Sequence, residues 1–212
     1  MIHVKVFEFN QFPVNTYLLW DESNEGVLID CGCIYPEEEK VLLDFIEGRG
    51  LHIKFLLNTH FHLDHAFGNK FFSDYSGLLP LVHKEDVLKL PSLAQQGMLF
   101  GFNINGQDVY SEHFLKEGDI VRFGYSELKV IHVPGHSPGS IVFYSEQDHF
   151  IISGDVLFRQ SVGRSDLWGG DGALLLRGIK EKLFSLPDDT IVYPGHGPST
   201  TIGFEKLHNP FV

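Results

Sequence analysis

The chain has 212 residues, of which 43% are hydrophobic, and a formal net charge of −12. This length is enough for one domain that buries roughly 70% of its unfolded surface, and the negative charge argues against nucleic acid as a partner. No stretch is apolar enough for a secretory signal or a membrane span. The only cysteines, Cys31 and Cys33, are too close for an unstrained disulfide, so we expect a reducing cytoplasm.

The first half of the chain alternates predicted strands with predicted helices. Apolar or alternating runs indicate strands at residues 3–9, 16–20, 27–30 and 53–57. Apolar residues at helical spacing predict a helix over Pro36–Glu47 and a second one over His65–Tyr75. In the second helix three phenylalanines fall on one side and are expected in the core: Phe67, Phe71 and Phe72.

The second half repeats this rhythm. A short strand is expected at residues 81–83, a run of strands within residues 120–153, a helix over Gly172–Leu186 and a strand at residues 190–193. Strands followed by helices in both halves predict an αββα sandwich, with two packed sheets between outer helices. We expect residues 1–212 to form this single domain.

The segment Pro91–Tyr110 does not fit that frame. It is rich in large apolar residues and glycine, and the apolar ones are Leu93, Met98, Leu99, Phe100, Phe102 and Ile104. Methionine and aromatic side chains suit adaptable contacts, so we expect a wall of a substrate pocket. A dimer contact or ordinary core are the alternatives, and the sequence leaves the oligomeric state open.

Four potential metal ligands lie within six residues, directly after the predicted strand 53–57. They are His60, His62, Asp64 and His65. Side chains two apart on extended backbone point the same way, so His60 and His62 can bind one ion, while Asp64 and His65 can face a second. Imidazole and carboxylate suit zinc, and also iron or manganese. Surface histidines beside a helix-capping Asp64 are the alternative, which so dense a cluster disfavours.

Three later segments share one design, in which a short apolar strand ends at a glycine and one ligand-type residue. The ligand-type residues are His136, Asp155 and His196. Glycine lets the backbone approach a ligand closely, and strand ends are the usual place for sites in sheet-based enzymes. Each segment alone is compatible with a tight turn, but together they supply the further ligands that two ions need.

Residues 135–139 also match the Gly-x-Ser-x-Gly motif of serine hydrolases, with Ser137 in the serine position. That motif uses the backbone N–H of the next residue as an oxyanion donor, and here the next residue is Pro138, which has none. A strand rather than a helix is predicted to follow. We therefore interpret Ser137 as a turn hydroxyl beside a ligand.

Taken in order, the motifs His-x-His-x-Asp-His, Gly-His-Ser-Pro-Gly-Ser, Gly-Asp and Pro-Gly-His-Gly resemble those of the metallo-β-lactamase superfamily. Within it, the chain is most similar to the short, single-domain glyoxalase II-like (hydroxyacylglutathione hydrolase-like) branch. Residues 162–166 and 205–211 share this resemblance, which extends from about Asn15 to Phe211. The motifs are specific for the superfamily and much less specific for substrate.

The resemblance implies two divalent metal ions, most simply zinc, bridged by Asp155. The other implied ligands are His60, His62 and His136 for one ion and Asp64, His65 and His196 for the second. Asp30 would accept a hydrogen bond that orients a ligand histidine, with a plain turn residue as the alternative. Arg164 would either pair with Asp166 or bind a substrate carboxylate.

The implied reaction is hydrolysis of an activated acyl bond in a small-molecule thioester or ester, such as S-lactoylglutathione. Hydroxide held by the metals would attack, with Asp64 orienting it. Full-length glyoxalase II resembles this chain plus a C-terminal helical region that helps hold glutathione. We therefore expect the thiol half to be held weakly, to be held by Pro91–Tyr110, or to be a different thiol.

Three other interpretations stay open. Persulfide dioxygenases resemble this fold and use one iron at the position of His60, His62 and His136. A lactonase-type or β-lactamase hydrolase uses the same residues on another substrate. A metal-binding protein without catalysis is the third.

Overall fold

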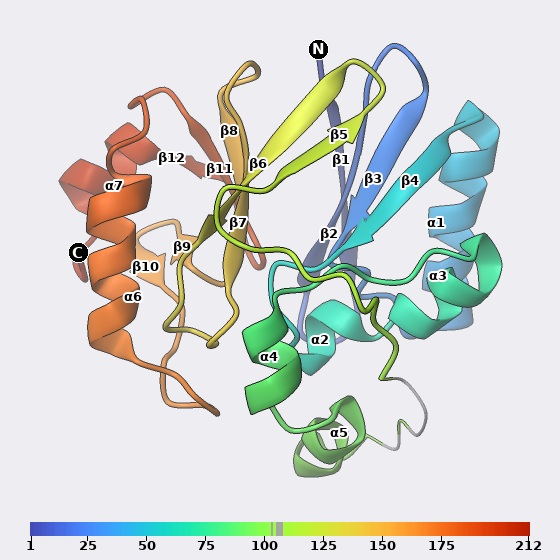
Figure 1. Ribbon diagram of the computed structural model, residues 1–212, viewed down its shortest axis with the longest axis horizontal. Coiled ribbons are helices and arrows are strands. Elements are labelled where there is room, and N and C mark those ends of the chain that lie inside the picture. Colours follow the sequence, from blue (N-terminus) through green and yellow to red (C-terminus); the bar gives the residue numbers. More distant parts are fainter. Residues whose placement is uncertain (103, 105–107) are drawn as a thin grey trace.

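Two β-sheets pack face to face and helices cover both outer faces, so the predicted αββα sandwich is confirmed (Figure 1). This computed structural model describes residues 1–102, 104 and 108–212. Among the described helices none is long and apolar enough to cross a membrane.

The first sheet has the strand order β1-β2-β3-β4. Its strands are β1 (His3–Phe9), β2 (Val14–Trp20), β3 (Glu25–Ile29) and β4 (His52–Leu57). β1, β2 and β3 are antiparallel neighbours, whereas β3 and β4 run parallel. The carboxyl ends of β3 and β4 therefore reach the same edge, and Asp30 and His60 follow them.

The second sheet has the order β12-β11-β8-β7-β6-β5. Its strands are β5 (Ile120–Phe123), β6 (Ser126–His132), β7 (Ile141–Ser145), β8 (Phe150–Gly154), β11 (Ile191–Pro194) and β12 (Thr200–Thr201). β8 and β11 are the parallel pair here, so Asp155 and His196 leave the sheet at the same edge. β9 (Leu157–Phe158) and β10 (Ser161–Val162) form a separate hairpin.

Helices cover each outer face. Those beside the first sheet or near the end of β4 are α1 (Pro36–Arg49), α2 (Leu63–Ala66), α3 (Asn69–Ser76), α4 (Lys84–Lys89) and α5 (Leu93–Phe100). Those beside the second sheet are α6 (Gly172–Gly178), the π-helix η1 (Ile179–Leu183) and α7 (Ile202–His208). The predicted helix over Gly172–Leu186 is therefore an α-helix that widens into a π-helix.

Side-chain alternation along β2 explains the layers. Tyr17 and Leu19 face the second sheet and pack in the core between the sheets, while Leu18 faces the outer helices and packs with Leu42 of α1. All seven residues of β2 are buried, because both faces of this strand are covered. On the other side of the molecule, Ile151 of β8 packs outward against η1.

The prediction of one continuous helix over His65–Tyr75 is wrong. The chain forms α2 and α3, separated at Phe67 and Gly68. Gly68 donates its N–H to the Cys31 carbonyl at 2.8 Å, and a Cβ there would lie 2.5 Å from Cys33 Sγ. The backbone at Gly68 is therefore in close contact with the buried, free cysteines. Because the helix is interrupted here, Phe67 packs in a different hydrophobic cluster from Phe72.

The segment Pro91–Tyr110 contains α5 and then returns toward β5. Ser92 and Gln95 close a reciprocal capping box at the helix start. Leu93 is fully buried, whereas Met98 and Leu99 are 72% and 65% exposed. Residues 103 and 105–107 of this segment lie outside the described residues. The predicted strand 81–83 consists only of isolated bridges at Leu81 and His83.

Candidate metal centre

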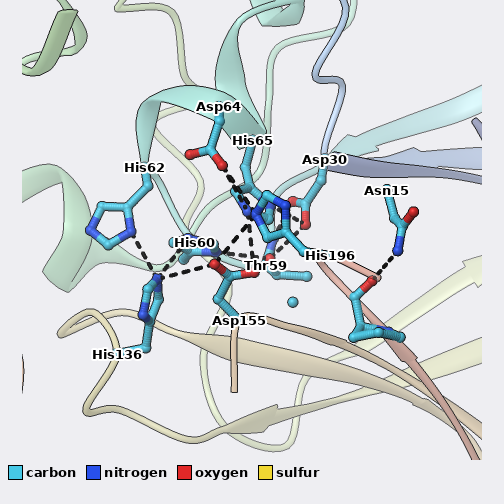
Figure 2. Close-up of polar contacts among 12 residues, drawn as sticks. Asn15, Asp30, Thr59, His60, His62, Asp64, His65, His136, Asp155 and His196 are labelled. Atoms are coloured by element: carbon cyan, nitrogen blue, oxygen red, sulfur yellow. Dashed lines mark hydrogen bonds and ion pairs between the residues drawn. The ribbon is translucent and has the colours of Figure 1, made fainter. Parts of the chain in front are cut away.

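The seven predicted ligand residues meet at one end of the sandwich, where strands of both sheets terminate (Figure 2). His60 and His62 lie in the loop after β4, and Asp64 and His65 in the first turn of α2. The second sheet contributes the remaining three from the loops after β6, β8 and β11, namely His136, Asp155 and His196.

Three histidines form the first group. His136 Nε2 lies 3.1 Å from His60 Nε2 and 2.9 Å from His62 Nδ1. All three side chains are buried. Their nitrogens therefore converge on one small, largely buried volume.

The second group comprises Asp64, His65 and His196. Asp64 Oδ2 is 3.1 Å from His196 Nε2 and 3.6 Å from His65 Nε2. Asp155 lies between the two groups, because its Oδ1 is 3.3 Å from His65 Nε2 and its Oδ2 is 3.6 Å from both His136 Nε2 and His196 Nε2. A carboxylate in this place can contact ions at both groups.

Proton accounting shows that the first group suits a cation. His136 Nδ1 is 2.7 Å from the Arg164 carbonyl, which only accepts, so that nitrogen carries the hydrogen and Nε2 is bare. Thr59 gives its hydroxyl hydrogen to Asp30 Oδ2 at 2.6 Å, so Thr59 Oγ1 must accept from His60 Nδ1 at 3.1 Å. The Nε2 atoms of His60 and His136 thus face each other as lone pairs, an arrangement that a metal ion stabilises.

The second group is oriented in the same manner. His65 Nδ1 donates to Asp30 Oδ2 at 2.9 Å, and His196 Nδ1 donates to the Pro13 carbonyl at 3.1 Å. Both rings therefore turn Nε2 toward the carboxylates. His65 Nε2 and Asp155 Oδ1 are buried without a hydrogen-bond partner of good geometry, as expected of atoms that bind a metal.

Electrostatics distinguishes the two groups. Burial lowers the pKa of His62 to about 3 and lowers the pKa of His60 and of His136, so the first group is neutral. Burial also opposes a charge on His65, but nearby carboxylates, Asp155 foremost, raise its pKa well above the usual value. The first group therefore offers neutral nitrogen lone pairs, and the carboxylates of the second group attract positive charge. Both properties suit the binding of two divalent cations.

Close backbone approach is built into the turn that carries His196. A Cβ on Gly195 would lie 2.2 Å from Asp155 Oδ1 and 2.7 Å from His65 Cε1, so only glycine fits. Asn15 of β2 fixes the same turn, because its side chain donates to the carbonyls of Pro194 at 3.0 Å and Gly197 at 2.9 Å.

Sequence reasoning did not single out Asn15 or Thr59 as contributors. Asn15 is an amide in an otherwise largely apolar strand, and it is 5% exposed. A polar residue in such a strand needs buried partners, which is the signal that could have identified it. Thr59 carried no signal beyond its place next to His60.

A cavity of about 220 Å³ opens onto both groups. Its apolar wall is made by Phe12, Leu63, Phe100, Leu167 and Trp168. Of the apolar residues expected from Pro91–Tyr110 to line a pocket, Phe100 does so; Phe102 packs behind it against Phe12 and Phe67. A larger groove of about 700 Å³ lies along β5, β6 and the end of β7, away from the ligand residues.

Asp30 and Arg164, the two predicted supporting residues, both reach the centre. Asp30 is fully buried and bonds His65 and Thr59. Arg164 lines the cavity, but its guanidinium is engaged by Asp166 at 2.7 and 2.8 Å, while its carbonyl holds His136. The pairing with Asp166 is one of the two roles considered for Arg164.

Comparison with known proteins agrees with this geometry. The family model described as "Metallo-beta-lactamase superfamily" matches residues 9–196. The hydroxyacylglutathione hydrolase GloC of Haemophilus influenzae is 34% identical over 212 residues, covering 100% of this chain and 98% of the relative. Two solved structures, each 36% identical, superpose over nearly all of both chains. BLEG-1 B3 metallo-beta-lactamase has a TM-score of 0.86 (100% of this chain, 99% of that one), and TTHA1623 in a di-iron-bound form has 0.85 (99% and 100%).

Proposed function

Because the chain belongs to the metallo-beta-lactamase superfamily, we propose that it is a binuclear metal-dependent hydrolase of an activated acyl bond. The leading substrate is a small-molecule thioester such as S-lactoylglutathione. Support for this substrate comes from the resemblance to GloC, which is named a hydroxyacylglutathione hydrolase and matches over the whole chain.

The observation that carries the proposal is the close approach of His60 Nε2 and His136 Nε2, whose Nδ1 partners leave both Nε2 atoms unprotonated. Nitrogen lone pairs 3.1 Å apart in a buried site repel each other unless a cation lies between them. The proposed ligands of the first ion are His60, His62 and His136, and those of the second are Asp64, His65 and His196, with Asp155 shared. Three histidines plus an open position are typical of catalytic zinc.

Each ion would supply a Lewis acid that polarises the substrate carbonyl and makes water nucleophilic near neutral pH. Asp64 lines the cavity with its side chain 21% exposed, so its carboxylate can accept a proton from the attacking water. Phe100 and Trp168 form part of the apolar wall of the cavity beside the ligands, which would hold the acyl or thiol group.

The test combines metal analysis with turnover. Purified protein is expected to hold about two zinc ions per chain and to hydrolyse S-lactoylglutathione, with the activity lost after chelation and restored by zinc. His62→Ala should lose one ion and most activity. His52→Ala, which removes an exposed histidine, serves as the control. Metal-loaded protein that is inactive toward a panel of thioesters, esters, lactones and β-lactams would contradict the proposal.

Iron is the main alternative metal, because a relative that is 36% identical has been solved in a di-iron-bound form. The same preparation should therefore be analysed for iron, and its oxygen consumption measured with a persulfide substrate. One iron per chain together with oxygen uptake would assign the protein as a persulfide dioxygenase. Two ions per chain without oxygen uptake would support the assignment as a hydrolase.

A further inference from the structure

Asp86 and Gln96 are two buried polar residues outside the proposed ligand set, and each is 1% exposed. Asp86 lies on α4. Its Oδ2 accepts the Phe61 N–H at 2.8 Å and the Ser137 hydroxyl at 2.9 Å, and its Oδ1 accepts the Gly139 N–H. One carboxylate thus joins the loop that carries His62 to the loop that carries His136.

Gln96 lies on α5 and holds the other side of the same turn. Its Oε1 accepts the Leu63 N–H at 3.1 Å, while its Nε2 donates to the Phe61 carbonyl at 3.2 Å and the Pro91 carbonyl at 2.9 Å. The amide therefore satisfies backbone groups on both neighbours of His62. Such a pattern needs a donor and an acceptor in one side chain, which an amide offers and an ionised carboxylate does not.

We propose that Asp86 and Gln96 are positioning residues that clamp the Phe61–Leu63 backbone and thereby fix His62 toward the first metal. This inference rests on the proposed function, because it assigns His62 to that ion. Metal ligands that are held by buried hydrogen bonds lose little freedom on binding, so removal of such supports commonly weakens binding by about 10–100-fold.

The clamp also links the metal group to the cavity wall. Phe100 lies four residues after Gln96, one turn further along α5, and it lines the cavity that contains His62. The helix that contacts the substrate is therefore the same helix that holds the ligand-bearing turn. Gln96 also lines this cavity, so metal affinity is the readout that separates its positioning role from direct contact with substrate.

The experiment compares Gln96→Glu with Gln95→Glu. The first replaces the Nε2 donor by an oxygen that faces two carbonyls. The second changes the adjacent, exposed glutamine, where glutamate also completes a capping box. Zinc affinity is measured by competition with a chromophoric chelator, together with kcat, KM and thermal unfolding of the metal-free proteins.

For Gln96→Glu we expect one of the two zinc ions to bind about 10–100-fold more weakly, the other to be unaffected, and kcat to fall more than KM changes. Gln95→Glu should match the wild type. Folded Gln96→Glu with wild-type affinity at both sites would overturn the inference. If the wild type itself binds no metal, it is the proposed function that fails.

Asp86→Asn is the second variant, because its amide oxygen can still accept from Phe61 and Ser137 while its NH2 group then faces the Gly139 N–H, a donor against a donor. It keeps the inference testable if Gln96→Glu does not fold. We expect the same selective loss of one ion. If neither variant folds, the two residues have a purely structural role and the inference is contradicted.

Discussion

Asp30 Oδ2 lies 2.9 Å from His65 Nδ1, and both side chains are fully buried. Asp30 has a φ of 54°, a left-handed conformation that is uncommon for a residue other than glycine. The Asp30 carboxylate also accepts the Thr59 N–H at 2.7 Å and the Thr59 hydroxyl. One side chain at the end of β3 thus orients His65 directly and His60 through Thr59.

The first prediction concerns this carboxylate. Asp30→Asn replaces one acceptor oxygen by a donor, which then faces either the Thr59 backbone N–H or both the Thr59 hydroxyl and the His65 N–H. We expect metal affinity to fall by about 10–100-fold and kcat to fall with it. The measurement is zinc competition on Asp30→Asn beside Asp44→Asn, an exposed aspartate on α1. Equal affinities in the two variants would refute an orienting role for Asp30.

The second prediction uses two glycines. Gly195→Ala would place a methyl group 2.2 Å from Asp155 Oδ1, so we expect at least one ion to be lost and activity to fall more than tenfold. Gly48→Ala is the control. Gly48 lies inside α1, and a Cβ added there would meet no neighbouring atom within 4 Å. This substitution should raise the free energy of unfolding by about 0.5–1 kcal/mol without affecting metal content. Normal metal binding by Gly195→Ala would show that the turn can shift at no cost.

The third prediction concerns the cavity wall. Phe100 lines the cavity, whereas the adjacent Leu99 is 65% exposed and does not. Phe100→Ala should raise KM several-fold with a smaller change in kcat, because it removes apolar contact with bound substrate rather than with the reacting atoms. Leu99→Ala should leave both constants unchanged. Steady-state kinetics on the two variants decides this, and identical behaviour would remove Phe100 from the substrate site.

The fourth prediction is a pH effect on stability from a residue outside the proposed ligand set. His83 stacks on His132, with ring centroids 4.1 Å apart, and burial lowers the pKa of His83 to about 4. As pH falls from 6.5 toward 4, the unfolded chain binds a proton at His83 before the folded chain does. The free energy of unfolding therefore decreases over this window. The contribution of His83 to that free energy is fully present above pH 6.5.

His83→Asn keeps an acceptor for the start of α4 and removes the titrating group. Between pH 7 and pH 4, metal-free wild type should lose about 1–2 kcal/mol more than this variant, a value reduced from the full shift because His83 is only half-buried. Denaturant unfolding at several pH values measures the difference. Parallel curves for the two proteins would contradict the prediction.

Local pattern was enough to predict the layers and the clustering of the ligand-type residues. A buried strand followed by His60, His62, Asp64 and His65 indicated the centre. The parallel pair β8 and β11 delivers Asp155 and His196 to the same edge, and His136 follows β6, which is antiparallel to its neighbour β7. That these residues bind metal stays a prediction. The fold class could be read from strand and helix periodicity because both sheets have covered outer faces.

Features that depend on contacts between distant segments could not be read from the sequence. The break between α2 and α3 arises where Gly68 meets Cys31 and Cys33, which no local pattern reports. The sequence predicted neither α4 nor α5, and the roles of Asp86 and Gln96 depend on the placement of these helices beside the loop of His62. Periodicity also did not distinguish Phe100, which faces the cavity, from exposed Met98.

The central claim is that seven side chains from both sheets bind two cations together. Its most direct test is titration of chelator-treated protein with zinc, followed by native mass spectrometry. We expect a mass increase that corresponds to two ions per folded chain, and one ion after His62→Ala. A folded wild-type chain that takes up no zinc, iron or manganese at micromolar concentrations would contradict the account.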